Sequence, residues 1–313
     1  MLRGQVVTAV SGFADLEHHR PIRVNDEFRL ASITKNYVAA LALDLDRDGV
    51  VELDARVGRW LPSLPDDLGF LRNVSMRQLL SHTTGLAQTF TDDRDRGRLL
   101  SKVAVLDRIP APVCKPRECW NYADGNYVVA GLVLQAATGT TLSKAIRTRF
   151  LLPHGLAHTH FIAPAAREPL PSFVLQVDPV TFQPVQPHRL RRQLLPIVLD
   201  DAAGGMMASA TDLARWADRL FIGHTIERDG VKQMLDTNLM RDLPCPQGCP
   251  LPYGLGVFHY TIADHAFVGH DGSSGAIVVT DVRDGLTIAI VTNGGEQDIR
   301  EFLVRVVHAV DGT

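Results

Sequence analysis

The segment that most constrains the fold of this chain is Ser32-Ile33-Thr34-Lys35, which stands directly before the apolar run 38–43. That run predicts a buried helix. Because residues three apart lie on one face of a helix, we expect the Ser32 hydroxyl beside the Lys35 amine at the helix N-terminus, where the dipole favours negative charge. A serine beside a group that can take its proton is an activated nucleophile. Taken alone, the tetrapeptide equally fits a helix with a serine cap and an incidental lysine.

Length and charge narrow the class of protein. A chain of 313 residues is long enough for one large domain or two closely joined lobes. Its 45% hydrophobic and 21% charged residues are typical of a soluble globular protein, and a net charge of -3 gives no general reason to expect nucleic acid as a partner. No apolar stretch reaches the roughly 18–20 residues that a membrane helix needs, and residues 1–7 lack the apolar core of a signal peptide.

The four cysteines form two close pairs, Cys114 with Cys119 and Cys245 with Cys249, in proline-rich segments typical of loops. Two short-range disulfides are the favoured interpretation, and they would indicate an oxidising compartment. Zinc binding is less favoured, because the spacings C-x4-C and C-x3-C depart from the C-x2-C knuckles of structural zinc sites. Free thiols are the third alternative.

Hydrophobic periodicity predicts both helices and strands along the chain. The helices are expected from 32 to about 48, from 75 to about 84, from 122 to 139, at about 211–221 and over 299–310. The strands are expected at 6–10, 254–257, 276–282 and 286–292, the last two joined by the hairpin turn 283–285. Strands at both ends with helices between them predict one sheet assembled from distant segments, plus a helical lobe in the middle.

Seven sequence blocks occur in the order typical of one family. They are FRLASITK at 28–35, the spaced G…LD…V…LP at 49–62, LLSHTTGL at 79–86, WNYADGNY at 120–127, AGGM at 203–206, YGLG at 253–256 and GHDG at 269–272. Together they resemble the serine hydrolases of the β-lactamase and penicillin-binding protein-like family. The resemblance is closest to the class C-like branch, which includes esterases and D-amino-acid peptidases.

The resemblance implies an α+β, β-lactamase/transpeptidase-like fold: an antiparallel sheet flanked by helices, plus a mostly helical lobe. It implies a single domain over 1–313, with the α/β lobe at about 1–60 and 205–313 and the helical lobe at about 61–204. The expected partner is a small-molecule or peptide substrate, and no cofactor or metal is expected. Segments 87–115 and 164–200 are expected to carry the residues that choose the substrate.

The resemblance also implies catalytic roles. Ser32 would attack a carbonyl and form an acyl-enzyme, while Lys35 and Tyr122 would share the proton transfers. The backbone N–H groups of Ser32 and Ser273, which follows His270-Asp271-Gly272, would form the oxyanion hole. His270 stands where the family often has Lys, and would line the far wall of the cleft as a hydrogen-bond donor or a titrating cation.

One departure from the family pattern is Asp124, which stands where an Asn is usual. An Asn offers an amide donor to the substrate, whereas an ionised Asp only accepts hydrogen bonds. Near Lys35, Asp124 should favour the charged ammonium and weaken Lys35 as a base. We hypothesise that Tyr122 is then the working base, or that Asp124 holds a cationic group of the substrate such as a free amine. A tolerated exchange, with Asn126 taking the usual role, is the alternative.

The second departure is at the N-terminus. The chain begins where the family's second strand is expected, and the usual N-terminal helix and first strand are absent. We therefore expect an uncovered sheet edge that another chain could pair with, or a start downstream of the true one. In the second case a signal segment could precede the given start, and the cysteine pairs would favour an extracytoplasmic location. Otherwise the location would be cytoplasmic.

Three further patterns resemble binding sites. Asp44-x-Asp46-x-Asp48-Gly49 mimics the start of a calcium loop, but Ala55 stands where the closing Glu is needed. The histidines at 154, 158 and 160 have metal-ligand character, but the block 153–156 matches a structural turn of the family, so a metal is the less favoured interpretation. His82 is expected to be a buried hydrogen-bonding residue rather than a general base.

Two functions follow. The favoured one is a serine hydrolase that acts through an acyl-enzyme on an ester or amide, with β-lactam hydrolysis secondary. The alternative is a catalytically impaired binding or sensor protein on the same fold, in which Asp124 or the short N-terminus spoils turnover. Intact Ser32, Lys35 and Tyr122 favour the enzyme.

Overall fold

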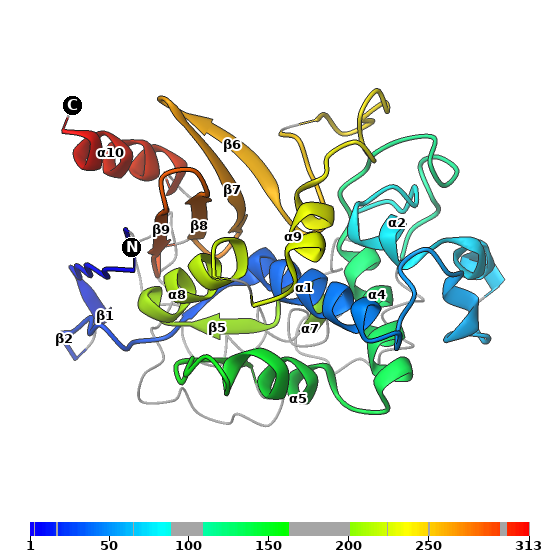
Figure 1. Cartoon of the computed structure of the whole chain (residues 1–313), viewed down its shortest axis with the longest axis horizontal. Coiled ribbons are helices and arrows are strands. Elements are labelled where there is room, and N and C mark those ends of the chain that lie inside the picture. The colour runs from blue at the N-terminus through cyan, green and yellow to red at the C-terminus, as the bar shows by residue number, and fades with distance from the viewer. Residues whose placement is uncertain are drawn as a thin grey trace.

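The computed structural model describes residues 1–2, 4–16, 18–64, 66–88, 109–162, 201–223, 225–249, 251–294 and 299–312. Its largest sheet is antiparallel, with strands in the order β6 (Phe258–Ile262), β7 (His265–Gly272), β8 (Ala276–Asp281) and β9 (Leu286–Val291). Alternate residues of β8 and β9 belong to different apolar clusters, so both faces of the sheet are buried. Helix α8 (Ala210–Phe221) covers one face and α10 (Ile299–Asp311) covers the other (Figure 1).

The helical layer is built around α1 (Thr34–Arg47), which follows the short helical turn η1 (Ala31–Ile33) and crosses the centre of the molecule in Figure 1. Residues 34–45 of α1 are all buried, the apolar run 37–43 together with the polar Lys35, Asn36 and Asp44, so α1 is a core helix. The other described helices and helical turns are η2 (Val57–Arg59), η3 (Asp66–Asn73), α2 (Met76–Leu80), α4 (Asp124–Thr138), α5 (Leu142–Ile146), η5 (Arg147–Leu151), α7 (Asp201–Gly204) and α9 (Arg228–Leu235).

Four of the five predicted helices are confirmed within a few residues, as α1, α4, α8 and α10. The predicted helix 75–84 begins as expected, with Ser75 and Gln78 forming a reciprocal capping box, but it ends at Leu80. The Ser81 hydroxyl contacts the Gln78 carbonyl at 3.4 Å and the Thr83 hydroxyl at 2.9 Å, and these local bonds compete with the helix.

The hairpin of β8 and β9 is confirmed, with Asp281 opposite Leu286 across the predicted turn. The predicted strand 254–257 is wrong, because both of its glycines hold the chain against other segments rather than in a ladder. A Cβ on Gly254 would collide with the Met234 carbonyl, and Gly256 has φ +74°. The strand begins only at β6, immediately after this turn, and its partner β7 was not predicted as a strand.

The predicted strand 6–10 is also wrong, because these residues do not pair with another strand of the described residues. Val7 in this segment is 88% exposed. High β-propensity does not build a strand without an edge to pair with. The edge of β9 instead pairs with Leu2 opposite Leu286, and Thr287 N–H donates to the Met1 carbonyl at 2.8 Å. Pairing of this edge with another chain stays a prediction.

Two smaller sheets complete the description. β1 (Phe13–Asp15) pairs with β2 (Arg20–Pro21). β3 (Phe28–Arg29) and β4 (Thr159–Phe161) flank the central strand β5 (Met206–Ala208), and both pairings are antiparallel. This three-stranded sheet matters for the site, because β3 leads directly into η1.

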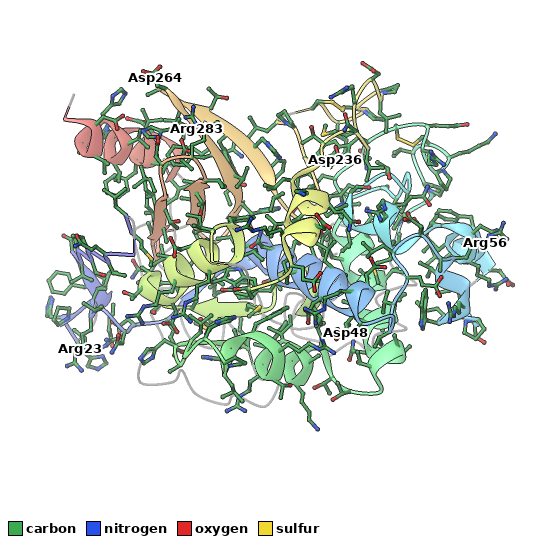
Figure 2. All side chains as sticks on the ribbon, in the orientation of Figure 1. Arg23, Asp48, Arg56, Asp236, Asp264 and Arg283 are labelled. Atoms are coloured by element: carbon green, nitrogen blue, oxygen red, sulfur yellow. A yellow bond between two sulfur atoms is a disulfide. The ribbon has the colours of Figure 1, made fainter. Side chains whose placement is uncertain are left out.

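One apolar cluster joins α1, α4 and α8 to the inner face of the main sheet. The proposed division into two lobes stays a prediction. The six charged residues labelled in Figure 2 are all exposed. Within the described ranges, no helix combines the length and apolar character that crossing a bilayer requires.

Both predicted disulfides are present, Cys114–Cys119 and Cys245–Cys249. The residues next to the two disulfides are joined by a hydrogen bond from the Trp120 N–H to the Pro244 carbonyl, 2.9 Å long. The disulfides therefore brace the chain just before Tyr122. The compartment that the cysteines suggest stays a prediction.

The close approach at Gly256 can be tested by substitution. A Cβ there would lie 2.7 Å from the Lys35 carbonyl oxygen and 2.8 Å from the Ala39 Cβ. We expect Gly256→Ala to destabilise the protein by about 1–3 kcal/mol beyond the cost of its left-handed backbone. Gly49→Ala is the matched control, since Gly49 has φ +70° and open space around it. Equal losses in urea unfolding for the two variants would contradict the packing argument.

Candidate active site

Ser32 lies in the turn η1, where β3 ends and α1 begins. Ala31, immediately before it, has φ +43°, which is strained for a residue with a Cβ. The end of β7 packs closely on this turn, because a Cβ on Gly272 would collide with the Leu30 carbonyl. This packing places Ser273, the residue after β7, at the wall of the cavity that Ser32 also lines.

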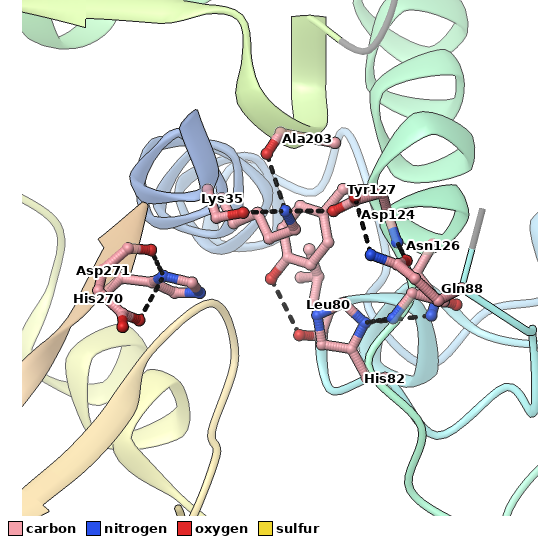
Figure 3. A network of polar contacts seen from close by, with 12 residues as sticks. Lys35, Leu80, His82, Gln88, Asp124, Asn126, Tyr127, Ala203, His270 and Asp271 are labelled. Atoms are coloured by element: carbon pink, nitrogen blue, oxygen red, sulfur yellow. Dashed lines mark hydrogen bonds and ion pairs between the residues drawn. The ribbon is translucent and has the colours of Figure 1, made fainter. Parts of the chain in front are cut away.

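Lys35 lies one helical turn after Ser32 and is fully buried. Its Nζ donates to the Ser32 Oγ at 3.0 Å, to the Asp124 Oδ1 at 2.7 Å and to the Ala203 carbonyl oxygen at 2.8 Å (Figure 3). The three acceptors satisfy all three protons of an ammonium group. The predicted side-by-side placement of Ser32 and Lys35 is therefore confirmed.

The surroundings of Lys35 favour its charged form. Burial alone would lower the pKa of Lys35, but the charge of Asp124, its hydrogen bond and the interaction with Tyr122 raise the pKa above its ordinary value. Lys35 is consequently an ammonium at rest, paired with the Asp124 carboxylate.

Tyr122 stands just before α4, with its ring centroid 5.0 Å from the Lys35 Nζ. Burial raises the pKa of Tyr122, interactions with Lys35 and Ser32 lower it, and the charge of Asp124 raises it further, so that it lies above the ordinary value. Tyr122 is therefore a neutral phenol at rest, and it lines the same cavity as Ser32.

Asp124 is the first residue of α4, and its side chain is 28% exposed. Besides the bond from Lys35 to Oδ1, its Oδ2 accepts from the Gln88 Nε2 at 3.1 Å and its backbone N–H donates to the Gln88 Oε1 at 2.8 Å. Both carboxylate oxygens are thus engaged (Figure 3). Asp124 does lie beside Lys35, as the sequence argument supposed.

His270 lies on β7 and is 1% exposed. Its Nδ1 is 2.6 Å from the Asp271 carbonyl oxygen, so Nδ1 carries the proton and Nε2 is an acceptor, with the Tyr253 hydroxyl at 3.3 Å. Burial is the main cause that lowers the pKa of His270 to about 4. Near neutral pH the side chain is uncharged, so the predicted titrating cation is corrected to a neutral imidazole.

His82 is fully buried, and burial lowers its pKa well below the ordinary value. Its Nδ1 accepts from the Ala123 N–H at 3.3 Å and lies 3.1 Å from the Asn126 amide nitrogen. The prediction of a buried hydrogen-bonding residue is confirmed. Asn126 is engaged with His82 and Thr84, and it is fully buried, so it does not take the exposed place of Asp124.

These residues surround a cavity of about 480 Å³. The described residues that line it are Ser32, Gln88, Trp120, Tyr122, Asp124, Gln247, Gly248, Cys249, Phe258, His270, Asp271, Ser273 and Arg300. All of the predicted site residues are here except Lys35 and Gly272, which lie directly behind the wall. The oxyanion role of the Ser32 and Ser273 N–H groups stays a prediction.

Gln88 and Arg300 line this cavity, and neither was among the predicted site residues. Gln88 falls inside the segment 87–115 proposed to select the substrate, two residues after LLSHTTGL, but nothing marked it individually. Arg300, at the start of α10, donates to the Asp271 Oδ2 at 2.6 Å, and no local pattern signals this pair. Most of segment 87–115 and all of 164–200 lie outside the described residues.

Comparison with known proteins agrees with this geometry. The family model described as Beta-lactamase matches residues 1–309, and the chain belongs to the Beta-lactamase family. It is 25% identical over 276 residues to Penicillin-binding protein 4* of Bacillus subtilis, covering 83% of the chain and 58% of that protein. It is 32% identical over 191 residues to Esterase EstB of Burkholderia gladioli, covering 55% of the chain and 48% of the esterase. The chain therefore spans only about half to three-fifths of the length of these two relatives.

Solved structures share the fold. The D-amino acid amidase from Ochrobactrum anthropi SV3, complexed with L-phenylalanine amide, has a TM-score of 0.80 and 23% identity, over 100% of this chain and 92% of the amidase. A penicillin-binding protein from Bacillus halodurans has a TM-score of 0.78 and 18% identity, over 98% and 94%. At this identity the likeness concerns the fold, and it confirms the predicted fold class.

The burial of neutral His270 predicts a pH dependence of stability. Its pKa is about 4 when folded and about 6.5 when unfolded, so the unfolded chain binds more protons between these values and stability falls as pH is lowered through them. We expect the wild type to lose about 2 kcal/mol more than His270→Gln between pH 6.5 and 4.5, measured by urea unfolding. Identical pH profiles for the two proteins would show that His270 is not buried in its neutral form.

Proposed function

We propose that this chain is a serine hydrolase that forms an acyl-enzyme on Ser32 with an ester or amide substrate. The observation that carries the proposal is the hydrogen bond from the Lys35 ammonium to Ser32, at the wall of a cavity that Tyr122 also lines. Ser32 can lose its proton as it attacks, and the negative charge that develops on its oxygen then lies close to the Lys35 ammonium. Esters, D-aminoacyl amides and β-lactams are the substrate classes to compare.

The proton transfer follows from the resting charges. With Lys35 an ammonium and Tyr122 a neutral phenol, the pair must first lose one proton before it can accept the proton of Ser32. The acceptor is then the Tyr122 oxygen, held beside Ser32 while Lys35 keeps its charge next to the developing alkoxide. The same proton passes to the leaving group when the tetrahedral intermediate collapses. The two titrations are coupled, so the pH profile reports the Lys35–Tyr122 pair as a unit.

The oxyanion of the intermediate would be bound by the backbone N–H groups of Ser32 and Ser273. Loss of one such donor typically costs about 3–4 kcal/mol of transition-state stabilisation. His270, as a neutral acceptor at Nε2, adds no positive charge to this wall of the cavity. Its two ring nitrogens are already engaged, by the Asp271 carbonyl and the Tyr253 hydroxyl, so it offers no charge to a substrate carboxylate.

The alternative is a catalytically impaired binding or sensor protein, and the Lys35–Asp124 ion pair is the feature that favours it. A lysine held as an ammonium is a poorer base than the neutral amine. In that case Ser32 would acylate slowly and turn over little.

Labelling separates the two functions. We expect a fluorophosphonate probe to modify Ser32, identified by mass spectrometry of the tryptic peptide, and the wild type to hydrolyse p-nitrophenyl esters. Ser32→Ala should remove both signals, because the nucleophile is gone, while Ser274→Ala is a control serine whose hydroxyl binds the Arg29 carbonyl. Adduct without ester turnover, or an unlabelled Ser32, would contradict the hydrolase and favour the binding or sensor protein.

The role of Asp124 predicts a shift in the pH profile. Its charge raises the pKa of both Lys35 and Tyr122, so Asp124→Asn should move the rising limb of kcat/KM for ester hydrolysis to lower pH. Asp271→Asn is the matched control: it removes a carboxylate from the same cavity wall, and Asp271 is not among the groups that shift either pKa. An unchanged or upward-shifted limb would contradict this role of the Asp124 charge.

The same variant tests whether Asp124 binds a substrate amine. Because both of its carboxylate oxygens are engaged by Lys35 and Gln88, we expect equal effects of Asp124→Asn on a D-aminoacyl ester and on its N-acylated form. A loss confined to the substrate with the free amine would restore the amine hypothesis.

A further inference from the structure

The loop between α9 and β6 forms part of the wall of the active-site cavity. Three consecutive residues of this loop, Gln247, Gly248 and Cys249, line the cavity together with Ser32. All three are exposed to solvent, so burial in the core does not fix where they lie. Another interaction must therefore hold this part of the wall in place.

The Cys245–Cys249 disulfide supplies that interaction. Cys245 is partly buried and packs against the apolar cluster that contains Trp120. The Pro244 carbonyl beside it accepts from the Trp120 N–H at 2.9 Å, and the Gly248 N–H donates to the Cys245 carbonyl at 2.9 Å. One end of the loop is thus fixed on the core, and the disulfide fixes the exposed end, Cys249, to it.

The other disulfide, Cys114–Cys119, has a different place in the structure. Neither of its cysteines is among the described residues that line the cavity. Cys119 is 2% exposed, and the Val113 N–H donates to the Gly85 carbonyl at 2.8 Å. Burial and a backbone hydrogen bond therefore hold that segment in addition to its disulfide, whereas the exposed loop 245–249 depends more on its own.

Gln247 is the residue of this loop that can recognise a substrate. Its side-chain amide offers both a hydrogen-bond donor and an acceptor. Within the part of the chain that the structure describes, no hydrogen bond engages this amide. The carboxylates that line the cavity are already paired: Asp124 binds Lys35. Asp271 binds Arg300. Gln247 is therefore an uncharged lining group that can pair with an amide of the substrate.

We propose that the disulfide-held loop 245–249 determines substrate specificity, with the Gln247 side chain binding an amide group of the substrate beyond the bond that is cleaved. The preferred substrates are then esters or amides of acylated amino acids rather than simple alkanoate esters. The disulfide positions Gln247 at the cavity and takes no part in the acylation of Ser32. This inference rests on the proposed hydrolase function and names the substrate class of the same site. It adds a specificity segment to the two that the sequence pointed to, 87–115 and 164–200.

Two p-nitrophenyl esters of matched shape test the proposal. The N-acetylglycine ester carries an amide, and in the pentanoate ester two carbon atoms replace that amide. We expect Gln247→Ala to raise KM for the N-acetylglycine ester about three- to tenfold, the usual effect of one lost hydrogen bond, with kcat little changed. The double variant Cys245→Ser/Cys249→Ser should have the same effect. Neither change should alter KM for the pentanoate ester.

Gln5→Ala, which removes an exposed glutamine outside the cavity, and the double variant Cys114→Ser/Cys119→Ser are the matched controls. Both should keep the wild-type ratio of kcat/KM for the two esters. Melting temperatures show whether each double variant folds, and Gln247→Ala, at an exposed position, serves if the cysteine variants do not. The inference is overturned if Gln247→Ala leaves KM for the N-acetylglycine ester unchanged, or if it weakens both esters equally.

Binding of boronic acids separates this inference from the hydrolase proposal. Boronic acids add reversibly to an activated serine and are not turned over, so calorimetry with acetamidomethylboronic acid and butylboronic acid needs no hydrolysis. If neither ester is hydrolysed but the wild type binds the acetamidomethyl acid more tightly, by a margin that Gln247→Ala removes, the hydrolase proposal fails and the role of the loop stands. If the wild type prefers the amide-bearing compound in neither assay, the role of the loop is overturned.

Discussion

The buried ammonium of Lys35 is the interaction on which the site depends. A charge removed from water is tolerated only where its protons find acceptors, and an unpaired one would cost several kcal/mol. Lys35 finds its acceptors on three separate segments: Ser32 in η1, Asp124 at the start of α4 and the Ala203 carbonyl in α7. Satisfying one cation therefore draws together three segments that are distant in sequence. The same hydrogen bonds therefore satisfy the buried lysine and position the nucleophile Ser32.

The carboxylate of Asp124 stabilises the charged form of Lys35 and makes Lys35 a weaker base. A neutral amide in its place would accept from the ammonium without a full opposite charge, leaving the amine easier to deprotonate. The carboxylate holds the proton on Lys35 and also raises the pKa of Tyr122. Both groups that could accept the Ser32 proton are thus biased toward their protonated forms. The form of the Lys35–Tyr122 pair that has lost one proton becomes more populated as pH rises. Asp124 sets the pH at which this happens, and it does so without contact with the substrate.

The sequence predicted those parts of the structure in which one segment carries the whole signal. Helices α1, α4, α8 and α10 and the β8–β9 hairpin have strong periodicity and their own turn residues, and each is confirmed. Strand β7 was missed because glycines and polar residues interrupt its apolar pattern, and it exists through pairing on both edges. The segment 6–10 fails for the opposite reason: it has the propensity of a strand and no partner. Propensity describes a residue, whereas a strand is a property of two segments.

The same distinction holds within the site. Ser32 and Lys35 were predictable because one helical turn joins them, and Tyr122 because an ordered block marks it. Gln88 and Arg300 take their places through contacts with Asp124 and Asp271 that no local spacing encodes. The charge of His270 was also beyond the sequence, since an imidazole becomes neutral or cationic according to its burial, which only the assembled sheet determines. Residue identity fixes what a side chain can do, and the packing around it decides which of those things it does.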